Sequence, residues 1–252
     1  MLLNEMTWME IRGRLREDPV VIQPVGSTEQ HGPHLPIQTD ICSAYEVAKA
    51  AGERTGCLVA PPLPYGYSEA WQTFPGTVSM TAQTFMACVA DIAESFVRGG
   101  FKRIFFLNGH NGNLPLLQTM MFQLMDRYGR RGNVLIGAGT YFLIAKDACD
   151  PIGDNFREGT HANEFETALM MHMRPDLVHL ERLGDWKYEP KLILSFRHGV
   201  TSVLHLPDSG KHNGVYGDPR RANPERGRAY FEACVTKVAE VVENFTPAYL
   251  GL

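Results

Sequence analysis

The chain has 252 residues, of which 44% are hydrophobic and 21% are charged, which is ordinary for a folded globular protein and argues against disorder. Its formal net charge is −4 and it contains no run of lysine or arginine, so we expect neither a nucleic-acid nor a membrane partner. The five cysteines are scattered and form no CxxC pair, which excludes a disulfide framework and a thiolate zinc site and favours a reducing, cytoplasmic location.

The predicted elements begin after a charged N-terminal segment. That segment, residues 1–18, contains no apolar run long enough for a signal peptide or a membrane span. The run PVVIQPVG (19–26) is short and β-branched, which is typical of a strand buried on both faces. Helical spacing follows over about residues 41–54, and Thr81 is placed to cap a later helix that reaches about residue 98.

A second buried strand, KRIFFLNG (102–109), ends in a glycine turn. The rest of the chain predicts one further strand and three helices, over about residues 133–139 for the strand and 114–128, 162–173 and 224–244 for the helices. Strands separated by crossover helices form a mainly parallel sheet that is covered on both faces. Because the chain has no linker or repeat, we expect an α/β protein with a single domain over residues 1–252.

Polar loops follow two of the predicted strands. GSTEQHGPH (26–34) comes after the first strand, and NGHNGN (108–113) comes after the second. In an open parallel sheet, ligands bind at the carboxyl ends of the strands. The two loops are therefore expected to converge on one rim of the sheet.

The loop after the first strand carries the side chains of a metal site. Glu29 and His31, two positions apart in an extended segment, project from the same side about 7 Å apart, a spacing that suits two neighbouring ions. Asp40, at the entry of the next helix, can return to the same point. Imidazole and carboxylate ligands without cysteine fit an open catalytic site for zinc, manganese or iron.

Simpler interpretations of single residues remain open. Asp40 is also a good helix N-cap, which is the usual role of an aspartate at that place. His34, next to a proline, would serve to brace a turn, and the Asn-Gly pairs of residues 108–113 are common turn formers. The co-occurrence of these residues at two strand ends favours the metal site.

A third segment, GTHANEFETALMMHM (159–173), adds another histidine and two acids. His161 and Glu164 share a face if the helix begins there, whereas Glu166 is rotated by about 200° from Glu164 and is expected to point elsewhere. The alternative is a helix N-terminus whose dipole favours acidic residues.

These segments, with FPGT (74–77) and GVYGDP (214–219), resemble the creatininase (creatinine amidohydrolase) family in the right order over nearly the whole chain. The combination of E-x-H-G-x-H-L-P with NGH is highly specific. The resemblance implies a three-layer α/β/α sandwich with a mainly parallel sheet, two divalent ions of zinc and/or manganese, and hydrolysis of C–N bonds. It also implies a homohexamer that acts on a small-molecule substrate.

The resemblance assigns roles to individual positions. Glu29 and His110 would bind one metal, His31 the other, and Asp40 would bridge them. His161 matches the histidine regarded in the family as the proton carrier.

The fifth metal ligand departs from the pattern of creatininase itself. There the carboxylate lies two residues after the NGH histidine, a position that Gly112 occupies here. Family members with a glycine-rich NGHxGN loop carry a glutamate in the later H-x-x-E-F-E segment instead. Glu164 occupies that place, so we expect it to be the fifth ligand.

The resulting expectation is an amidohydrolase that acts on C–N bonds other than peptide bonds, in a cyclic amide or a formamide. A hydroxide bridging the metals would attack the carbonyl, and His161 would pass the proton to the leaving nitrogen. Trp71, Tyr141 and Arg157 are candidates for substrate contact. Two alternatives remain: hydrolysis of a C–C bond in a cyclic ketone or ketosugar, and metal binding without catalysis.

Overall fold

A parallel sheet of four strands lies at the centre of the protein. The computed structural model describes residues 1–128, 134–153, 161–185, 194–197, 200–203, 213–249 and 251. The strands are β1 (Val20–Val25), β2 (Leu58–Val59), β3 (Arg103–Asn108) and β4 (Leu135–Thr140). They are arranged in the order β2-β1-β3-β4, and every neighbouring pair is parallel.

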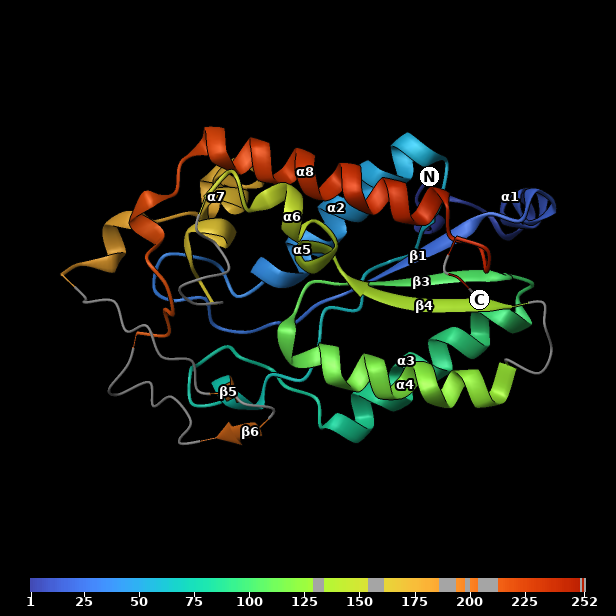
Figure 1. Ribbon diagram of the computed structural model, residues 1–252, viewed down its shortest axis with the longest axis horizontal. Helices are drawn as coiled ribbons and strands as arrows, with labels where there is room; N and C mark the ends of the chain where they lie inside the picture. The colour runs from blue at the N-terminus through green and yellow to red at the C-terminus, as the bar shows by residue number, and fades with distance from the viewer. Residues whose placement is uncertain are drawn as a thin grey trace.

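Helices cover both faces of this sheet (Figure 1). On one face lie α2 (Thr39–Thr55), α5 (Tyr141–Ile144), α6 (Lys146–Cys149), α7 (Glu164–Met173) and α8 (Pro224–Glu243), and on the other lie α3 (Ala82–Arg98) and α4 (Leu114–Tyr128). Successive residues of a strand point to opposite faces, so β1 contributes to two hydrophobic cores. Ile22 packs in the core under α2 and α8, whereas Val21 packs in the core under α3 and α4. The molecule is therefore the expected three-layer α/β/α sandwich.

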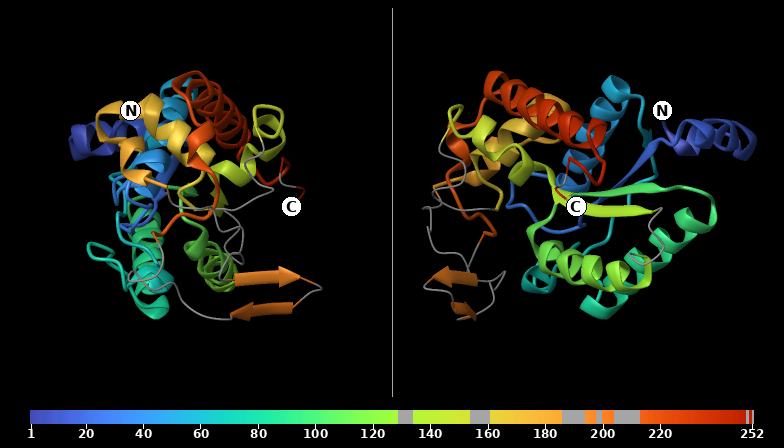
Figure 2. Two further views of the ribbon diagram at one scale, coloured as in Figure 1. Left: turned by 90° about the vertical axis from the view of Figure 1, so that its left-hand side faces the viewer. Right: turned by 45° about the vertical axis from the view of Figure 1, so that its right-hand side comes forward.

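Two smaller features lie outside the sandwich. The short helix α1 (Trp8–Arg14), which begins with a capping box between Thr7 and Glu10, projects beyond one end of the sheet (Figures 1 and 2). At the opposite end, β5 (Leu194–Arg197) and β6 (Val200–Val203) pair in an antiparallel hairpin that stands apart from the central sheet. None of the described helices is long and apolar enough to cross a membrane.

Most predicted elements agree with the structure, and the exceptions lie at helix starts. Thr81 caps α3 as predicted, because its side chain accepts a hydrogen bond from the main-chain N–H of Thr84. The helix predicted from about residue 41 begins at Thr39, so Asp40 lies inside its first turn, after the N-cap Gln38. Asp40 is therefore not a cap, and its carboxylate is available for other contacts.

The strand order shows where a ligand would bind. From β1 the chain crosses to β2 on one side, and it later returns to add β3 on the other side of β1. The crossover helices that follow β1 and β3 lie on opposite faces, so the topology has a switch point between the carboxyl ends of these two strands, which is where ligands bind in open α/β sheets. The two polar loops follow β1 and β3, and they meet at this switch point.

Candidate metal centre

Close backbone packing brings the two loops against the start of α2. A Cβ atom on Gly26, just after β1, would lie 2.6 Å from the Cα atom of Ile41. A Cβ atom on Gly109, just after β3, would lie 2.4 Å from the main-chain oxygen of Asp40. Only glycine allows both strand ends to approach the helix this closely. The first turn of α2 is thereby held between the ends of β1 and β3.

Asp40 is at the centre of the side-chain cluster that forms there. Its Oδ1 atom lies 3.1 Å from Nε2 of His31, and its Oδ2 atom lies 2.9 Å from Nδ1 of His110. Ser27 donates a hydrogen bond of 3.0 Å to Oδ2. Each carboxylate oxygen thus faces a different histidine, which is the arrangement that a carboxylate bridging two ions requires.

The remaining nitrogen of each of these histidines is anchored on a main-chain carbonyl. His31 uses Nδ1 to contact the oxygen of Glu29 at 3.1 Å, and His110 uses Nε2 to contact the oxygen of Tyr67 at 2.9 Å. A carbonyl oxygen can only accept, so these nitrogens carry a hydrogen, and the opposite nitrogens, which face the carboxylates, are the ones that can bind a proton or a metal ion. Metal-binding histidines are held by outer contacts of this kind.

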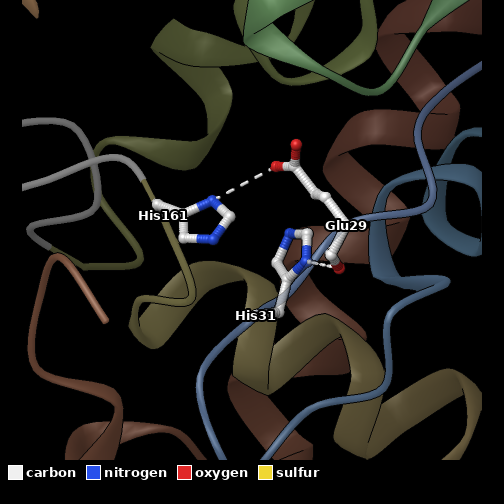
Figure 3. A group of neighbouring side chains, drawn as sticks. All are labelled: Glu29, His31 and His161. Atoms are coloured by element: carbon white, nitrogen blue, oxygen red, sulfur yellow. Dashed lines mark hydrogen bonds and ion pairs between the residues drawn. The ribbon is translucent and has the colours of Figure 1, made fainter. Parts of the chain in front are cut away.

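Glu29 completes one side of the cluster and is 1% exposed. Its Oε1 atom lies 3.3 Å from Nδ1 of His110 and 3.5 Å from Nδ1 of His161. Figure 3 shows the carboxylate of Glu29 and the ring of His161 facing each other, with His31 beside them. Among the described residues, the buried Oε2 atom of Glu29 has no hydrogen-bond partner.

The glutamate that approaches the cluster from α7 is Glu166, and Glu164 points away from it. Oε1 of Glu166 lies 3.8 Å from Nε2 of His31, and Oε2 accepts a hydrogen bond from the main-chain N–H of Ala162. Glu164 instead accepts hydrogen bonds from Tyr230 at 3.0 Å and from Arg226 at 3.2 Å, both on α8. The expected position of Glu164 at the cluster is therefore wrong.

The error comes from the start of the helix. α7 begins at Glu164, with Asn163 as its N-cap, and His161 lies before it in an extended segment that pairs with Tyr216. Ala162 turns the chain with a φ of 53°. Because His161 is outside the helix, helical spacing does not relate it to Glu164 or Glu166.

Burial and the close contacts between acids and imidazoles shift the pKa values of the residues in the cluster. Burial alone would lower the pKa of His31, but the charge and hydrogen bond of Asp40 outweigh it and raise this pKa to about 10. Burial likewise opposes protonation of His110, yet Glu29 and Asp40 raise its pKa well above the usual value. Burial raises the pKa of Glu166 to about 7, although His31 acts in the opposite direction. The acids therefore create a field that attracts positive charge.

The chemistry of these residues fits divalent cations. Three groups of close ligand atoms occur among the described residues: Glu29 with His31 and His161, Glu29 with Asp40 and His110, and His31 with Asp40 and Glu166. Nitrogen lone pairs and carboxylate oxygens that face one another at about 3 Å repel unless a proton or a metal ion lies between them. The unpartnered Oε2 of Glu29 is a further vacant donor atom, and mixed N/O ligands suit zinc or manganese.

His161 is at the edge of the cluster beneath an aromatic cover. Its ring stacks on Trp71 with centroids 4.2 Å apart and an interplanar angle of 20°, and it lies 4.3 Å from the ring of His31. Trp71 ends a short 3-10 helix, Glu69–Trp71, and is 6% exposed. The structure thus brings Trp71 to the site, in contact with the histidine expected to carry the proton.

Tyr141 and His34 have surroundings that favour structural roles. Tyr141 is 2% exposed in the core under α8, where it packs on Phe142 and Phe165, a location that favours a structural role over substrate contact. Arg157 lies outside the described residues. His34 is buried and bonds the hydroxyl of Thr167 on α7 at 2.9 Å, so it braces the loop against that helix.

Comparisons with known proteins identify the family and the fold. A family model described as "Creatininase: Creatinine amidohydrolase" matches residues 4–242. Creatinine amidohydrolase of Pseudomonas putida is 30% identical, over 97% of both chains. A mycofactocin precursor peptide peptidase of Mycobacterium ulcerans is 32% identical, over 93% of this chain and 88% of the relative. A solved structure titled "Creatininase Mn" superposes with a TM-score of 0.83 and 28% identity, covering 98% of each chain.

Proposed function

Because the chain belongs to the creatininase family of metal-dependent hydrolases, we propose that it hydrolyses the C–N bond of an amide at a centre of two divalent metal ions. The observation that carries the proposal is the position of Asp40, which turns one carboxylate oxygen to His31 and the other to His110. We propose five metal-binding residues: Glu29, His31, Asp40, His110 and Glu166. Glu166 replaces Glu164 in this set because only Glu166 approaches His31.

The positions of the proposed ligands divide them between two ions. Glu29 and His110 approach each other from the loops after β1 and β3, so they would hold one ion, while His31 and Glu166 would hold the other. Zinc and manganese are the ions that we propose, and the manganese-containing relative supports the second. When bound, such ions polarise a carbonyl group and lower the pKa of water towards neutrality.

His161 is proposed as the proton carrier. Its Nδ1 atom faces the cluster, 3.5 Å from Oε1 of Glu29, so it can accept a proton there and deliver it to the leaving nitrogen. Trp71 and Tyr216, whose ring centroids are 5.7 Å apart, cover this part of the site and limit the access of bulk water to the histidine. Residues 1–252 would form one creatininase-like domain. The family resemblance supports assembly into a hexamer, which a mass measurement in solution would test, and the scattered cysteines suit a cytoplasmic location.

Two classes of amide substrate are open to this site. A cyclic amide or a formamide corresponds to the relative that acts on creatinine, and a peptide bond corresponds to the relatives that are peptidases. We favour the small non-peptide substrate, because the proposed proton carrier is only 6% exposed beneath Trp71.

A hydrolysis screen tests the proposal. The zinc-loaded and the manganese-loaded protein would each be incubated with lactams, hydantoins, formamides and short peptides, and new amine and carboxyl groups would be detected. We expect one amide class to be cleaved, with loss of activity on chelation and in the His161→Ala variant. Cleavage of peptides alone would favour the second candidate, and activity that survives complete removal of metal would contradict the proposal.

A further inference from the structure

Two of the sequence motifs contain no proposed metal-binding residue, yet both contact Gln30. FPGT (74–77) contributes Thr77, and GVYGDP (214–219) contributes Gly214. Gln30 itself lies between Glu29 and His31 and is 6% exposed. A residue in this position can act on the cluster without being a ligand.

Both main-chain groups of Gln30 are engaged. Its N–H donates to the hydroxyl of Thr77 at 3.0 Å. Its carbonyl oxygen lies 2.7 Å from Nε2 of His161. The peptide groups on either side of Gln30 therefore connect the FPGT segment to the histidine that we propose as proton carrier.

The side-chain amide of Gln30 holds a third segment. Its Oε1 atom accepts a hydrogen bond of 2.8 Å from the N–H of Gly32, and its Nε2 atom donates to the carbonyl of Gly214 at 3.1 Å. Gly214 has a φ of 82°, and a Cβ atom there would lie 1.8 Å from Oε1 of Gln30. The GVYGDP segment can approach the amide this closely only because it has glycine at this position.

The contacts of Gln30 favour a hydrogen on Nε2 of His161. Nε2 of His161 lies 2.7 Å from the Gln30 carbonyl and 2.9 Å from the Gln30 amide nitrogen. The carbonyl only accepts and is the nearer of the two groups, so a hydrogen on Nε2 forms a good bond to it. The amide nitrogen only donates, and the Gly214 carbonyl is its acceptor. Nδ1 then keeps its lone pair, and this is the nitrogen that faces Glu29.

The same contacts hold the ring in place. Two main-chain hydrogen bonds, of 3.3 and 2.9 Å, join His161 to Tyr216, two residues after Gly214. Trp71 covers one face of the ring and His31 lies against it from within the cluster. Gln30 therefore acts on His161 in two ways. It hydrogen-bonds Gly214, in the segment that pairs with the backbone of His161, and it contacts the ring of His161 directly.

We infer that Gln30 is a positioning residue, which holds His161 in the form with hydrogen on Nε2 and leaves Nδ1 free to take up a proton at the metal centre. The carbonyl of Gln30 orients the ring of His161. Thr77 fixes the main chain of Gln30, and the side-chain amide of Gln30 fixes the Gly214–Tyr216 segment. The inference rests on the proposed role of His161, and it assigns a purpose to the FPGT and GVYGDP motifs.

The hydrogen position can be measured without any activity. Long-range ¹H–¹⁵N correlation spectra of the ¹⁵N-labelled, zinc-loaded protein report which ring nitrogen of each neutral histidine is protonated, and a His161→Gln spectrum assigns the signals. We expect His161 to be a single species with hydrogen on Nε2 in the unsubstituted protein. In Gln30→Ala we expect both forms to appear, because the carbonyl is no longer held.

Kinetics complete the test. In Gln30→Ala we expect kcat to fall about 10–100-fold, the size typical of supporting residues around a metal site, with KM and zinc content nearly unchanged. Gln72→Ala, at an exposed position beside Trp71, is the matched control and should change neither readout. Thr77→Val should have a smaller effect in the same direction, and it replaces Gln30→Ala as the test variant if that protein does not fold.

Two results would overturn the inference. One is a spectrum of the unsubstituted protein that places the hydrogen of His161 on Nδ1. The other is a test variant, Gln30→Ala or the replacement Thr77→Val, that keeps a single form of His161 and full kcat. A protein that cleaves no amide would instead contradict the proposed function, and the spectra would still decide the role of Gln30.

Discussion

Two glutamates of α7 that are two positions apart have opposite surroundings. Glu166 approaches the histidines of the cluster, where burial and nearby acids raise its pKa to about 7. Glu164 faces α8, where Tyr230 and Arg226 hold it in a network of hydrogen bonds. Around Glu166 several acids face the histidines, so a metal cation would be stabilised there. Glu164 already has the positive charge of Arg226 beside it. Metal binding should therefore depend on one glutamate and folding on the other.

The first prediction compares these glutamates. Glu166→Gln keeps the size of the side chain but removes the charge that offsets a divalent cation, so we expect about one bound metal per chain in place of two. Glu164→Gln should keep both metals and lower the free energy of unfolding by about 1 kcal/mol, through weaker bonds to Arg226 and Tyr230. Elemental analysis and denaturant unfolding measure the two effects. If Glu164→Gln loses a metal ion and Glu166→Gln keeps both, Glu164 is the ligand and the assignment of Glu166 is wrong.

The second prediction concerns His161. If it carries a proton, His161→Ala should lower kcat by about 10²–10⁴-fold and leave the metal content unchanged. The geometry offers a competing role, because one possible ligand atom from each of His161, Glu29 and His31 lies within 4.8 Å of the others. Elemental analysis of the variant separates the two roles. Loss of one metal together with activity would make His161 a ligand.

At the scale of elements, helix starts limited what the sequence could predict. The hydrophobic pattern located α4 at Leu114–Tyr128 as predicted, because the spacing of apolar residues reports which face is buried. It could not locate the first residue of α7, because that residue depends on capping. The useful signal was Asn163 followed by Glu166, a capping pattern in which the second side chain turns back past the helix start. That turn carries Glu166 into the cluster.

The third prediction tests the packing of α7 on α8, which presents Glu166 to the site. A Cβ atom on Gly227 would lie 1.9 Å from the carbonyl oxygen of Ala168, so the helices must separate to admit a methyl group. We expect Gly227→Ala to lower the free energy of unfolding by about 1–3 kcal/mol. Gly13→Ala is the control, because nothing lies within 4 Å of that position in α1. The control should stabilise the protein slightly, by about 0.5–1 kcal/mol. Equal stability of the two variants would contradict this account of the interface.

At the scale of the whole molecule, the topology explains why residues distant in sequence share one centre. The strand order β2-β1-β3-β4 places a topological switch point between β1 and β3, and the two loops that leave these strands carry Glu29, His31 and His110. This convergence was predictable, because parallel strands end at a common edge. The contacts of His161 with Trp71 and Gln30 were not predictable, since they depend on the packing of three loops that have no repeating pattern.

The last prediction links the metal centre to the stability of the whole fold. Burying Glu29, Asp40 and Glu166 together costs free energy that bound cations offset, so the chelated protein should unfold at a lower temperature. A metal at about 100 times its dissociation constant stabilises the folded state by about 2.7 kcal/mol per site. For a chain of this length that corresponds to a rise in Tm of roughly 5–11 °C for each site.

Asp40 decides whether this stabilisation comes from the proposed centre. Asp40→Asn removes the charge shared by both ions while the side chain keeps its size, so adding zinc or manganese to the chelated variant should raise Tm only slightly. Glu164→Gln, whose carboxylate lies outside the cluster, should respond to metal as fully as the unsubstituted protein does. Calorimetry with and without metal measures all three proteins. A full metal-dependent rise in Tm for Asp40→Asn would contradict the proposed role of Asp40, whose two carboxylate oxygens lie 3.1 and 2.9 Å from His31 and His110.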